Sequence, residues 1–341
     1  MKFTKFAGYV LTSFLVGSTP LAAQAFQSAS PDSGVQSFDT FDGVPVAIDF
    51  AGQVTGQNII GAFVRDRDGT VTNFDVNGLP AFPQAMNEGG KIAGTGTCFD
   101  STQTCGFIRK KNGNVIIFDP LPSGQYLLNL SVAAINTSGQ VAGFISYFPQ
   151  SEGIMHEFGF VRYVDGSISI FPDQQGGTFP LWEVTAMNSA GTIVGFLDDG
   201  GGYIAPFLRS PDGTVTTFTT SDGLVPGRFT AISPCGEITG YLRSGDYAFV
   251  RDVNGALTTF SVPDSILTQP VAITPSGKIV GSYVDVNGAE HGFLRMRTGK
   301  IQTFDVPDST NTYPTSVNAE GDIAGWYSDS SGNVRGFIRW H

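Results

Sequence analysis

The chain has 341 residues, of which 41% are hydrophobic, 12% aromatic and 14% charged. Its 44 glycines and 19 prolines would interrupt too many helices for a helical bundle, and its low charge excludes a coiled coil. The formal net charge of −11 repels phosphate groups, so we expect neither a nucleic-acid partner nor binding to an anionic membrane surface.

Residues 1–25 have the pattern of a secretory signal peptide. Lys2 and Lys5 give a positive start, residues 6–16 form a short apolar stretch, and Ala23-Gln24-Ala25 fits the small-x-small cleavage pattern. An ordinary N-terminal strand or helix is the alternative. No later apolar run approaches the roughly 20 residues that span a bilayer, so we expect no membrane insertion after cleavage. The sequence therefore predicts a secreted or periplasmic protein.

The three cysteines fit an exported chain. Cys98 and Cys105 bracket six residues, and under oxidising conditions we expect them to form a disulfide that staples one loop. A metal site explains them less well, because no second pair of cysteines or histidines lies nearby. Cys235 has no evident partner in the sequence.

One pattern recurs seven times along the rest of the chain. In its first copy, residues 47–56 carry a small residue, Ile, Asp and a turn glycine, and residues 63–65 read Phe-Val-Arg. The turn glycines lie 38–52 residues apart, which matches the blade-sized period of about 40–50 residues. They are Gly52, Gly90, Gly139, Gly191, Gly236, Gly277 and Gly321. The Phe-aliphatic-Arg copies begin at Phe63, Phe107, Phe160, Phe207, Phe249, Phe293 and Phe337.

Each copy predicts four short antiparallel strands, which is the blade of a β-propeller. Most of the turns between the third and fourth strands contain Asp-Gly or Asn-Gly, a strong hairpin signal. The seventh copy lacks a fourth strand, and residues 34–39 match the missing one. We therefore expect an all-β, seven-bladed propeller over residues 34–341, closed by its N-terminal strand and preceded by a linker at 26–33.

The recurring Phe and Arg residues predict how blades pack. We expect the Phe side chains to fill the space between wedge-shaped blades. Burial of each should stabilise the fold by roughly 1.5–3 kcal/mol. Each Arg lies two residues after a Phe and shares its face of the strand. We expect it to pin blade corners through carboxylates or carbonyls, since a functional residue would not need seven copies.

This repeated sequence pattern resembles the bacterial extracellular repeat family named HAF, after a His-Ala-Phe core in the third strand. The nearest copies are His291-Gly292-Phe293-Leu294-Arg295 and Tyr247-Ala248-Phe249-Val250-Arg251. The resemblance covers essentially the whole chain after the leader. It implies an exported repeat protein and brings no catalytic residues with it.

Few residues suggest a metal or cofactor. The only histidines are His156, His291 and His341, and neither a nucleophile elbow nor a phosphate-binding loop of the Walker type is present. Calcium is the more plausible ion, because turns beginning at Asp66, Asp252 and Asp285 read Asp-x-Asp/Asn-Gly, but each lacks the distal glutamate of a calcium loop. Hairpin turn chemistry explains these turns better, and we expect no metal and no cofactor.

The connections before the first strand and after the second strand of each unit vary most, and they carry aromatic residues suited to sugar rings or peptides. Packing at the channel mouth, or the start of the first strand, is the alternative for these aromatics. Residues 144–157 form the longest such connection and are a candidate binding loop. Phe82 is a further aromatic of this group, and the expected ligand-binding residues are Tyr126, Trp182, Arg228, Phe229, Tyr313 and His291.

We therefore expect a non-enzymatic, monomeric binding module whose ligand is an extracellular glycan or protein. The alternative is a secreted hydrolase or lyase that uses acidic residues at the channel mouth. Its candidate carboxylates are Asp198, Asp199, Asp246 and Glu290. A purely structural surface protein is a third hypothesis.

Overall fold

A computed structural model describes most of the chain. The described ranges are 35–38, 43–98, 103–121, 127–147, 156–171, 181–198, 204–218, 226–242 and 247–341, and for 35–38, 98, 103 and 226 they give the backbone alone. The expected leader and linker lie outside these ranges, so that division of the chain stays a prediction. The described ranges contain no helix long and apolar enough to cross a membrane.

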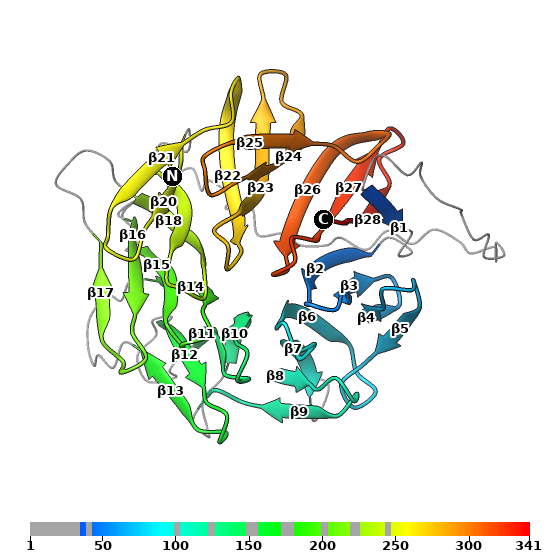
Figure 1. Ribbon diagram of the computed structural model, residues 1–341. Coiled ribbons are helices and arrows are strands. Elements are labelled where there is room, and N and C mark those ends of the chain that lie inside the picture. Colours follow the sequence, from blue (N-terminus) through cyan, green and yellow to red (C-terminus); the bar gives the residue numbers. More distant parts are fainter. Residues whose placement is uncertain are drawn as a thin grey trace, which may run out of the picture.

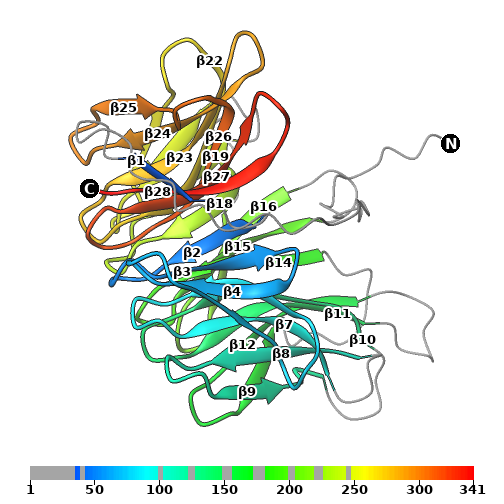
Figure 2. The ribbon, with the colours of Figure 1, turned by 90° about the vertical axis from the view of Figure 1, so that its right-hand side faces the viewer.

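The predicted propeller is confirmed. Seven four-stranded antiparallel sheets stand as blades around a central axis (Figure 1), and the edge view shows their strands running between the two faces of the ring (Figure 2). The innermost strands are β2 (Val44–Ile48), β6 (Ala81–Met86), β10 (Leu127–Ile135), β14 (Leu181–Met187), β18 (Pro226–Ile232), β22 (Ser265–Ile273) and β26 (Ser309–Val317). The second strands are β3 (Val54–Asn58), β7 (Ile92–Cys98), β11 (Val141–Tyr147), β15 (Ile193–Asp198), β19 (Ile238–Leu242), β23 (Ile279–Asp285) and β27 (Ile323–Asp329).

The outer half of each blade follows the same order. The third strands are β4 (Gly61–Arg65), β8 (Gln103–Arg109), β12 (His156–Arg162), β16 (Ile204–Arg209), β20 (Ala248–Arg251), β24 (Glu290–Arg295) and β28 (Val334–Arg339). The outermost strands are β5 (Val71–Phe74), β9 (Val115–Phe118), β13 (Ile168–Phe171), β17 (Val215–Thr217), β21 (Leu257–Phe260), β25 (Ile301–Phe304) and, for the seventh blade, β1 (Val35–Phe38).

The chain closes its own ring, as the sequence predicts. Strand β1 pairs with β28 in an antiparallel register that places Val35 opposite Arg339 and Phe38 opposite Gly336. A second contact joins the seventh and first blades, because the side-chain amide of Asn318 donates a 3.0 Å hydrogen bond to the backbone carbonyl of Asp49. Closure therefore pairs the outer edge of β28, which would otherwise be open to association with another chain.

Every innermost strand has a bulge at the same place. In β18 the register shifts between Phe229, which lies opposite Gly240, and Ala231, so that Thr230 is the extra residue. The bulge presses the backbone carbonyl of Arg228 to 2.0 Å from the point where a Cβ on Gly240 would lie. The glycine that follows Ile-Val in the sequence pattern is needed because no other residue fits against that carbonyl.

The repeated Arg residues pin neighbouring blades, but their partner differs from the one expected. The Arg109 guanidinium of the second blade lies 4.9 Å from the ring centre of Phe74 in the first blade. The same contact recurs from Arg162 to Phe118 and from Arg295 to Phe260. The Arg therefore binds mainly an aromatic face of the preceding blade, and carboxylates at blade corners are not its main partners. A carbonyl contact accompanies it in several copies, such as the 3.2 Å hydrogen bond from Arg162 to the Tyr163 carbonyl.

The Phe residues form the core between blades. The seven third-strand Phe side chains are fully buried, and each described ring of the outermost strands packs near the next blade, as Phe74 does on Phe107 at 6.1 Å between ring centres. In the turns that precede the outermost strands, only the glycine has a positive φ, such as Gly69 at 94°. The Asp or Asn before it instead accepts a backbone N–H, as Asp68 does from Thr70.

Candidate active site

The bulged inner strands, which lie nearest the axis of the ring (Figure 1), carry one set of residues at equivalent register positions. These are the residues three positions before the small Ala or Ser of each inner strand, and we call them the variable positions. They differ in every blade, whereas the residues around them repeat. They are Val44, Phe82, Ser131, Glu183, Arg228, Gln269 and Tyr313.

A hollow of about 260 Å³ opens beside β14, β18 and β22. Two variable positions, Glu183 and Arg228, line it together with the bulge residues Thr185 and Thr230. It is completed by Phe196, Phe229, Tyr241, Pro270 and Val271. A β-bulge changes the direction in which nearby side chains point. The bulge of each inner strand requires a glycine on the second strand, and in β14 and β18 it also turns Thr185 and Thr230 toward the hollow.

Arg228 is held over an aromatic ring in this hollow. Its guanidinium lies 4.0 Å from the ring centre of Phe196, which belongs to the neighbouring blade and is 3% exposed. The buried ring restricts the guanidinium and leaves its planar edge to donate hydrogen bonds elsewhere. Thr185 is fixed in turn by a 2.8 Å hydrogen bond from its hydroxyl to the carbonyl of Phe229.

Burial shifts the ionisation of the acidic groups around Arg228. Desolvation raises the pKa of Glu183, and the nearby Arg228 guanidinium opposes this shift. Glu157, on β12 of the preceding blade, has its pKa raised to about 7 by desolvation and by the charge of Glu183. Burial also raises the pKa of Tyr241, against the influence of Arg228. The four groups therefore act on one another electrostatically and form one cluster.

The cluster has the components of acid–base chemistry. Glu157 titrates near neutral pH, so it can both take up and release a proton there. Glu183 keeps a second carboxylate beside it, while Arg228 and the protonated Tyr241 can donate hydrogen bonds to an oxygen that gains negative charge. The cluster is thus equipped to move a proton at Glu157, which acts on Glu183 but does not itself line the hollow, and to stabilise the resulting charge at Arg228 and Tyr241.

The structure brings together only some of the residues expected from the sequence. Arg228 and Phe229 line the hollow. Tyr313 stacks on Trp326 at another variable position, with 3.8 Å between ring centres. Tyr126 lies outside the described residues.

Trp182 is placed away from the hollow. Its ring is 6% exposed and packs between Phe171 and Phe207, with ring centres 6.3 and 4.9 Å away. The side chain therefore belongs to the core between blades, and a direct role in ligand contact does not follow from its position. Phe82, Trp182, Phe229 and Tyr313 all lie in inner strands, which agrees with the alternative that these aromatics begin the first strand of a blade.

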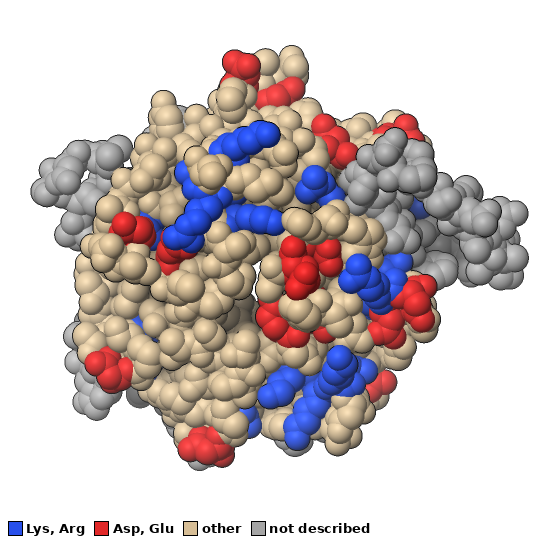
Figure 3. All heavy atoms as spheres, viewed as in Figure 1, with Lys and Arg blue, Asp and Glu red and all other residues tan. Residues whose placement is uncertain are grey.

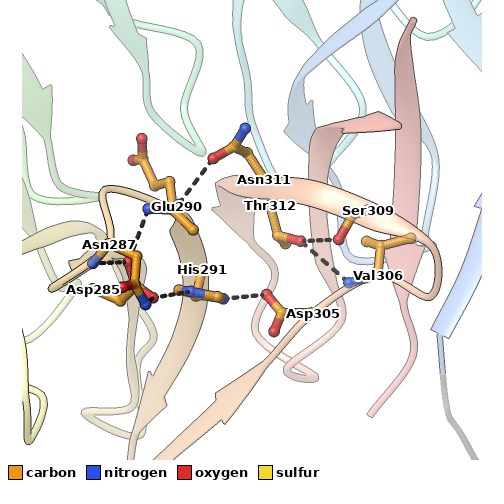
Figure 4. Close-up of polar contacts among 10 residues, drawn as sticks. Asp285, Asn287, Glu290, His291, Asp305, Val306, Ser309, Asn311 and Thr312 are labelled. Atoms are coloured by element: carbon orange, nitrogen blue, oxygen red, sulfur yellow. Dashed lines mark hydrogen bonds and ion pairs between the residues drawn. The ribbon is translucent and has the colours of Figure 1, made fainter. Parts of the chain in front are cut away.

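His291 and Glu290 belong to a separate polar network at the junction of the sixth and seventh blades (Figure 4). The Nδ1 of His291 lies 2.9 Å from a carboxylate oxygen of Asp305, and its Nε2 lies 3.7 Å from Asp285. The backbone N–H of Glu290 donates to the side-chain oxygen of Asn311 on the next blade at 2.9 Å. This arrangement ties the hairpin of β23 and β24 to neighbouring elements.

The other acidic candidates are not gathered into a site by the described residues. Asp198 is the last residue of β15 and Glu290 the first of β24, so both are in strands and not in loops. Asp199 and Asp246 lie outside the described residues. The candidate loop 144–157 is shorter than expected, because Phe144–Tyr147 continue β11 and His156 and Glu157 begin β12.

Two of the three calcium-like turns use their first carboxylate internally, while in the third the Asp66 carboxylate accepts a hydrogen bond from the Gln53 side chain. Asp285 accepts backbone N–H groups from Asn287 and Ala289 at 2.8 and 2.9 Å, and Asp252 binds Asn254 and Ala256 in the same way. Within the described ranges, no group of three or more His, Cys, Asp or Glu side chains could hold a metal ion. Hairpin chemistry therefore accounts for these turns.

A second acidic cluster lies in the turns that follow the inner strands β2, β6 and β26, and Figure 3 shows one face of the ring. Desolvation raises the pKa of Glu88 there, and the charges of Asp49 and Glu320 add to the effect. Acidic side chains gather beside the central hollow of this face, with basic side chains around them (Figure 3). Arg67 lies 4.3 Å from the Trp340 ring centre and 3.9 Å from Asp322, so an arginine over an aromatic ring beside a carboxylate is not confined to the end at Glu183 and Arg228.

The expected disulfide stays a prediction. Cys98 pairs with Gln103 in the backbone register and Cys105 with Gly96, so the two cysteines share one hairpin and one face of it. The side chain of Cys98 lies outside the described residues. Cys235 is free and exposed.

Sequence reasoning missed Glu157, Glu183 and Tyr241. A signal for Glu183 was available, because an alignment of the seven repeats shows that its position varies within an otherwise regular strand. Glu157 carries no comparable signal. The sequence places it in the connection 144–157, and only the packing of two blades brings it beside Glu183.

Comparison with solved structures supports the fold. A streptogramin B lyase structure superposes with a TM-score of 0.57 at 14% identity, covering 90% of this chain and 97% of that one. Virginiamycin B lyase from Staphylococcus aureus gives 0.56 at 13% identity, covering 90% and 99%. A mutant of puromycin hydrolase complexed with PGG gives 0.58 at 12% identity and covers 90% of this chain but 55% of that one. No family model and no curated protein sequence matches the chain.

Proposed function

We propose that this protein is an enzyme, a hydrolase or lyase that works by acid–base catalysis in the channel hollow. The observation that carries the proposal is Glu157, a carboxyl with a pKa of about 7 beside Glu183 and the Glu183–Arg228–Tyr241 hollow. This supports the hydrolase or lyase hypothesis more than a non-enzymatic binding module. An export leader, a glycan or protein ligand and membership of the HAF family remain expectations from the sequence.

In the proposed reaction, Glu157 transfers the proton, and burial together with Glu183 sets its ionisation. Burial, and after it the charge of an ionised Glu183, raise the pKa of Glu157 to about 7, so that Glu157 is partly protonated at neutral pH and can give its proton to a substrate. Arg228 and Tyr241 would donate hydrogen bonds to the substrate oxygen on which negative charge develops. The similar fold of two lyases and a hydrolase agrees with this class of reaction, although the low identity carries no residue roles across.

The test compares carboxylate variants on a panel of chromogenic 4-nitrophenyl esters and glycosides and of unsaturated-product lyase substrates. Glu157→Gln should lower kcat by roughly 100-fold or more, since positioned acid–base groups contribute about 10²–10⁴-fold. Glu237→Gln is the matched control, because Glu237 pairs with Arg297 in a turn at the other end of its blade. Full turnover by both Glu157→Gln and Glu183→Gln would overturn the proposal. Binding of a panel member without any turnover by the wild type would favour the binding module instead.

A further inference from the structure

The seven variable positions divide the channel into two unlike halves. The seventh, first and second blades contribute Tyr313, Val44 and Phe82, which are aromatic or aliphatic. The third to sixth blades contribute Ser131, Glu183, Arg228 and Gln269, which are polar or charged. Figure 1 shows β26, β2 and β6 along one side of the ring and β10, β14, β18 and β22 along the other.

The apolar half offers flat rings at the same level as the charged cluster. Tyr313 lies opposite Trp326 in the register of β26 and β27, as Glu183 lies opposite Phe196 and Arg228 opposite Tyr241. Tyr313 and Trp326 stack at 3.8 Å with 17° between their planes. The Phe82 side chain is 44% exposed, which is unusual for a large aromatic on an inner strand of this chain.

The charges of the polar half limit what can bind there. Arg228 is the only cation among the variable positions, and it stands beside the Glu183 carboxyl, which in turn acts on the Glu157 carboxyl, in a protein of net charge −11. A polyanion or a free carboxylate would be repelled, whereas a neutral carbonyl oxygen could accept hydrogen bonds from Arg228 and Tyr241 without bringing a charge.

We propose that the channel takes a neutral, amphipathic small molecule in which a flat ring is joined to a carbonyl group. The ring lies against Tyr313, Trp326 and Phe82, and the carbonyl lies in the hollow at Arg228. The inference rests on the proposed function, because it names the substrate class of the same site. A flat apolar face belongs to both aryl and pyranose rings, so the test includes one probe of each kind.

Binding is measured by ligand-detected NMR titration with four probes. Benzamide joins an aryl ring to a neutral amide and N-acetylglucosamine joins a pyranose to one, while benzoate replaces the amide by a carboxylate and acetamide lacks the ring. We expect benzamide or N-acetylglucosamine, according to the kind of ring, to bind at least roughly tenfold more tightly than benzoate and acetamide. Equal binding of all four, or preference for benzoate, would overturn the inference.

Two variants locate the bound ring. Trp326→Leu and the more exposed Phe82→Ala should each weaken the preferred probe roughly three- to tenfold, because stacking on an aromatic ring is lost. Trp340→Phe is the control, since Trp340 lies under Arg67 beside the turn at Gly52. Unchanged probe binding in both folded variants would contradict the placement of the ring.

Failure of this inference can be told apart from failure of the proposed function. Glu157→Gln should lower kcat by roughly 100-fold or more while leaving probe binding within about twofold, since Glu157 does not line the hollow or touch the apolar half. If Glu157→Gln loses turnover but the two aromatic variants bind normally, the substrate class is wrong and the enzyme assignment stands. If the aromatic variants lose binding but both Glu157→Gln and Glu183→Gln turn over normally, the substrate class stands and the acid–base role of the two carboxyl groups is wrong.

Discussion

Glu157 shows how burial by a neighbouring blade changes one residue. Its carboxyl belongs to β12, but its ionisation is set by loss of solvent and by Glu183 on β14. A raised carboxyl pKa means that the folded chain holds the proton more tightly than the unfolded chain does. The same shift that suits Glu157 for proton transfer near neutral pH therefore lowers the stability of the fold once the proton is lost.

The pH dependence of stability tests this residue directly. The contribution of Glu157 is fully present below its ordinary pKa of 4.5 and is lost as the pH rises through about 7. Because the side chain is partly solvated, we expect the loss to be about 1–2 kcal/mol, less than the full shift implies. Denaturant unfolding at several pH values should show this decline in the wild type and a smaller one in Glu157→Gln. Parallel curves for the two proteins would contradict the assignment.

Two residues recur in the sequence pattern of every blade, and the structure explains why each is needed. The second-strand glycine accommodates the carbonyl of the bulged inner strand, and the third-strand arginine lies on an aromatic ring of the preceding blade. The first feature shapes the channel wall and the second holds adjacent blades together. Both recur because every blade meets its neighbours in the same geometry.

Gly281→Ala tests the bulge at a blade outside the charged cluster. An added Cβ would lie 2.1 Å from the Gln269 carbonyl oxygen and 2.7 Å from the Phe293 ring, so backbone must move. We expect a loss of about 1–3 kcal/mol or more in unfolding free energy, measured by thermal and denaturant unfolding. Gly89→Ala is the control, because its nearest atom is 3.5 Å away and belongs to the Asn87 side chain. Equal stability of the two variants would show that the close approach does not constrain the strand.

At the scale of the whole molecule, the ring depends on contacts between residues far apart in the chain. Strand β1 supplies the outermost strand of a blade whose other strands span Ser309–Arg339. Beneath it, Phe337 is fully buried, and the Asn318–Asp49 hydrogen bond joins the same two blades at their inner strands. Closure therefore protects both the core of the seventh blade and its edge.

Truncation tests the contribution of closure. A chain that starts at residue 43 lacks β1 and should lose its hydrogen bonds to β28, each of which contributes about 0.5–1.5 kcal/mol. We expect a lower Tm than for a chain that starts at residue 34, together with association through the exposed β28 edge in size-exclusion chromatography. Identical Tm values for the two chains would contradict a stabilising role for β1.

The sequence by itself determined the fold of this protein, because blade geometry repeats and each copy must satisfy the same constraints. The buried Phe, the turn glycines and the N-terminal match to the missing strand were enough to predict seven closed blades. It did not determine the site, because a site is built from positions that do not repeat. Glu157, Glu183, Arg228 and Tyr241 come from three blades, and only tertiary packing places them together. The same packing buries Glu157, Glu183 and Tyr241 enough to raise their pKa values.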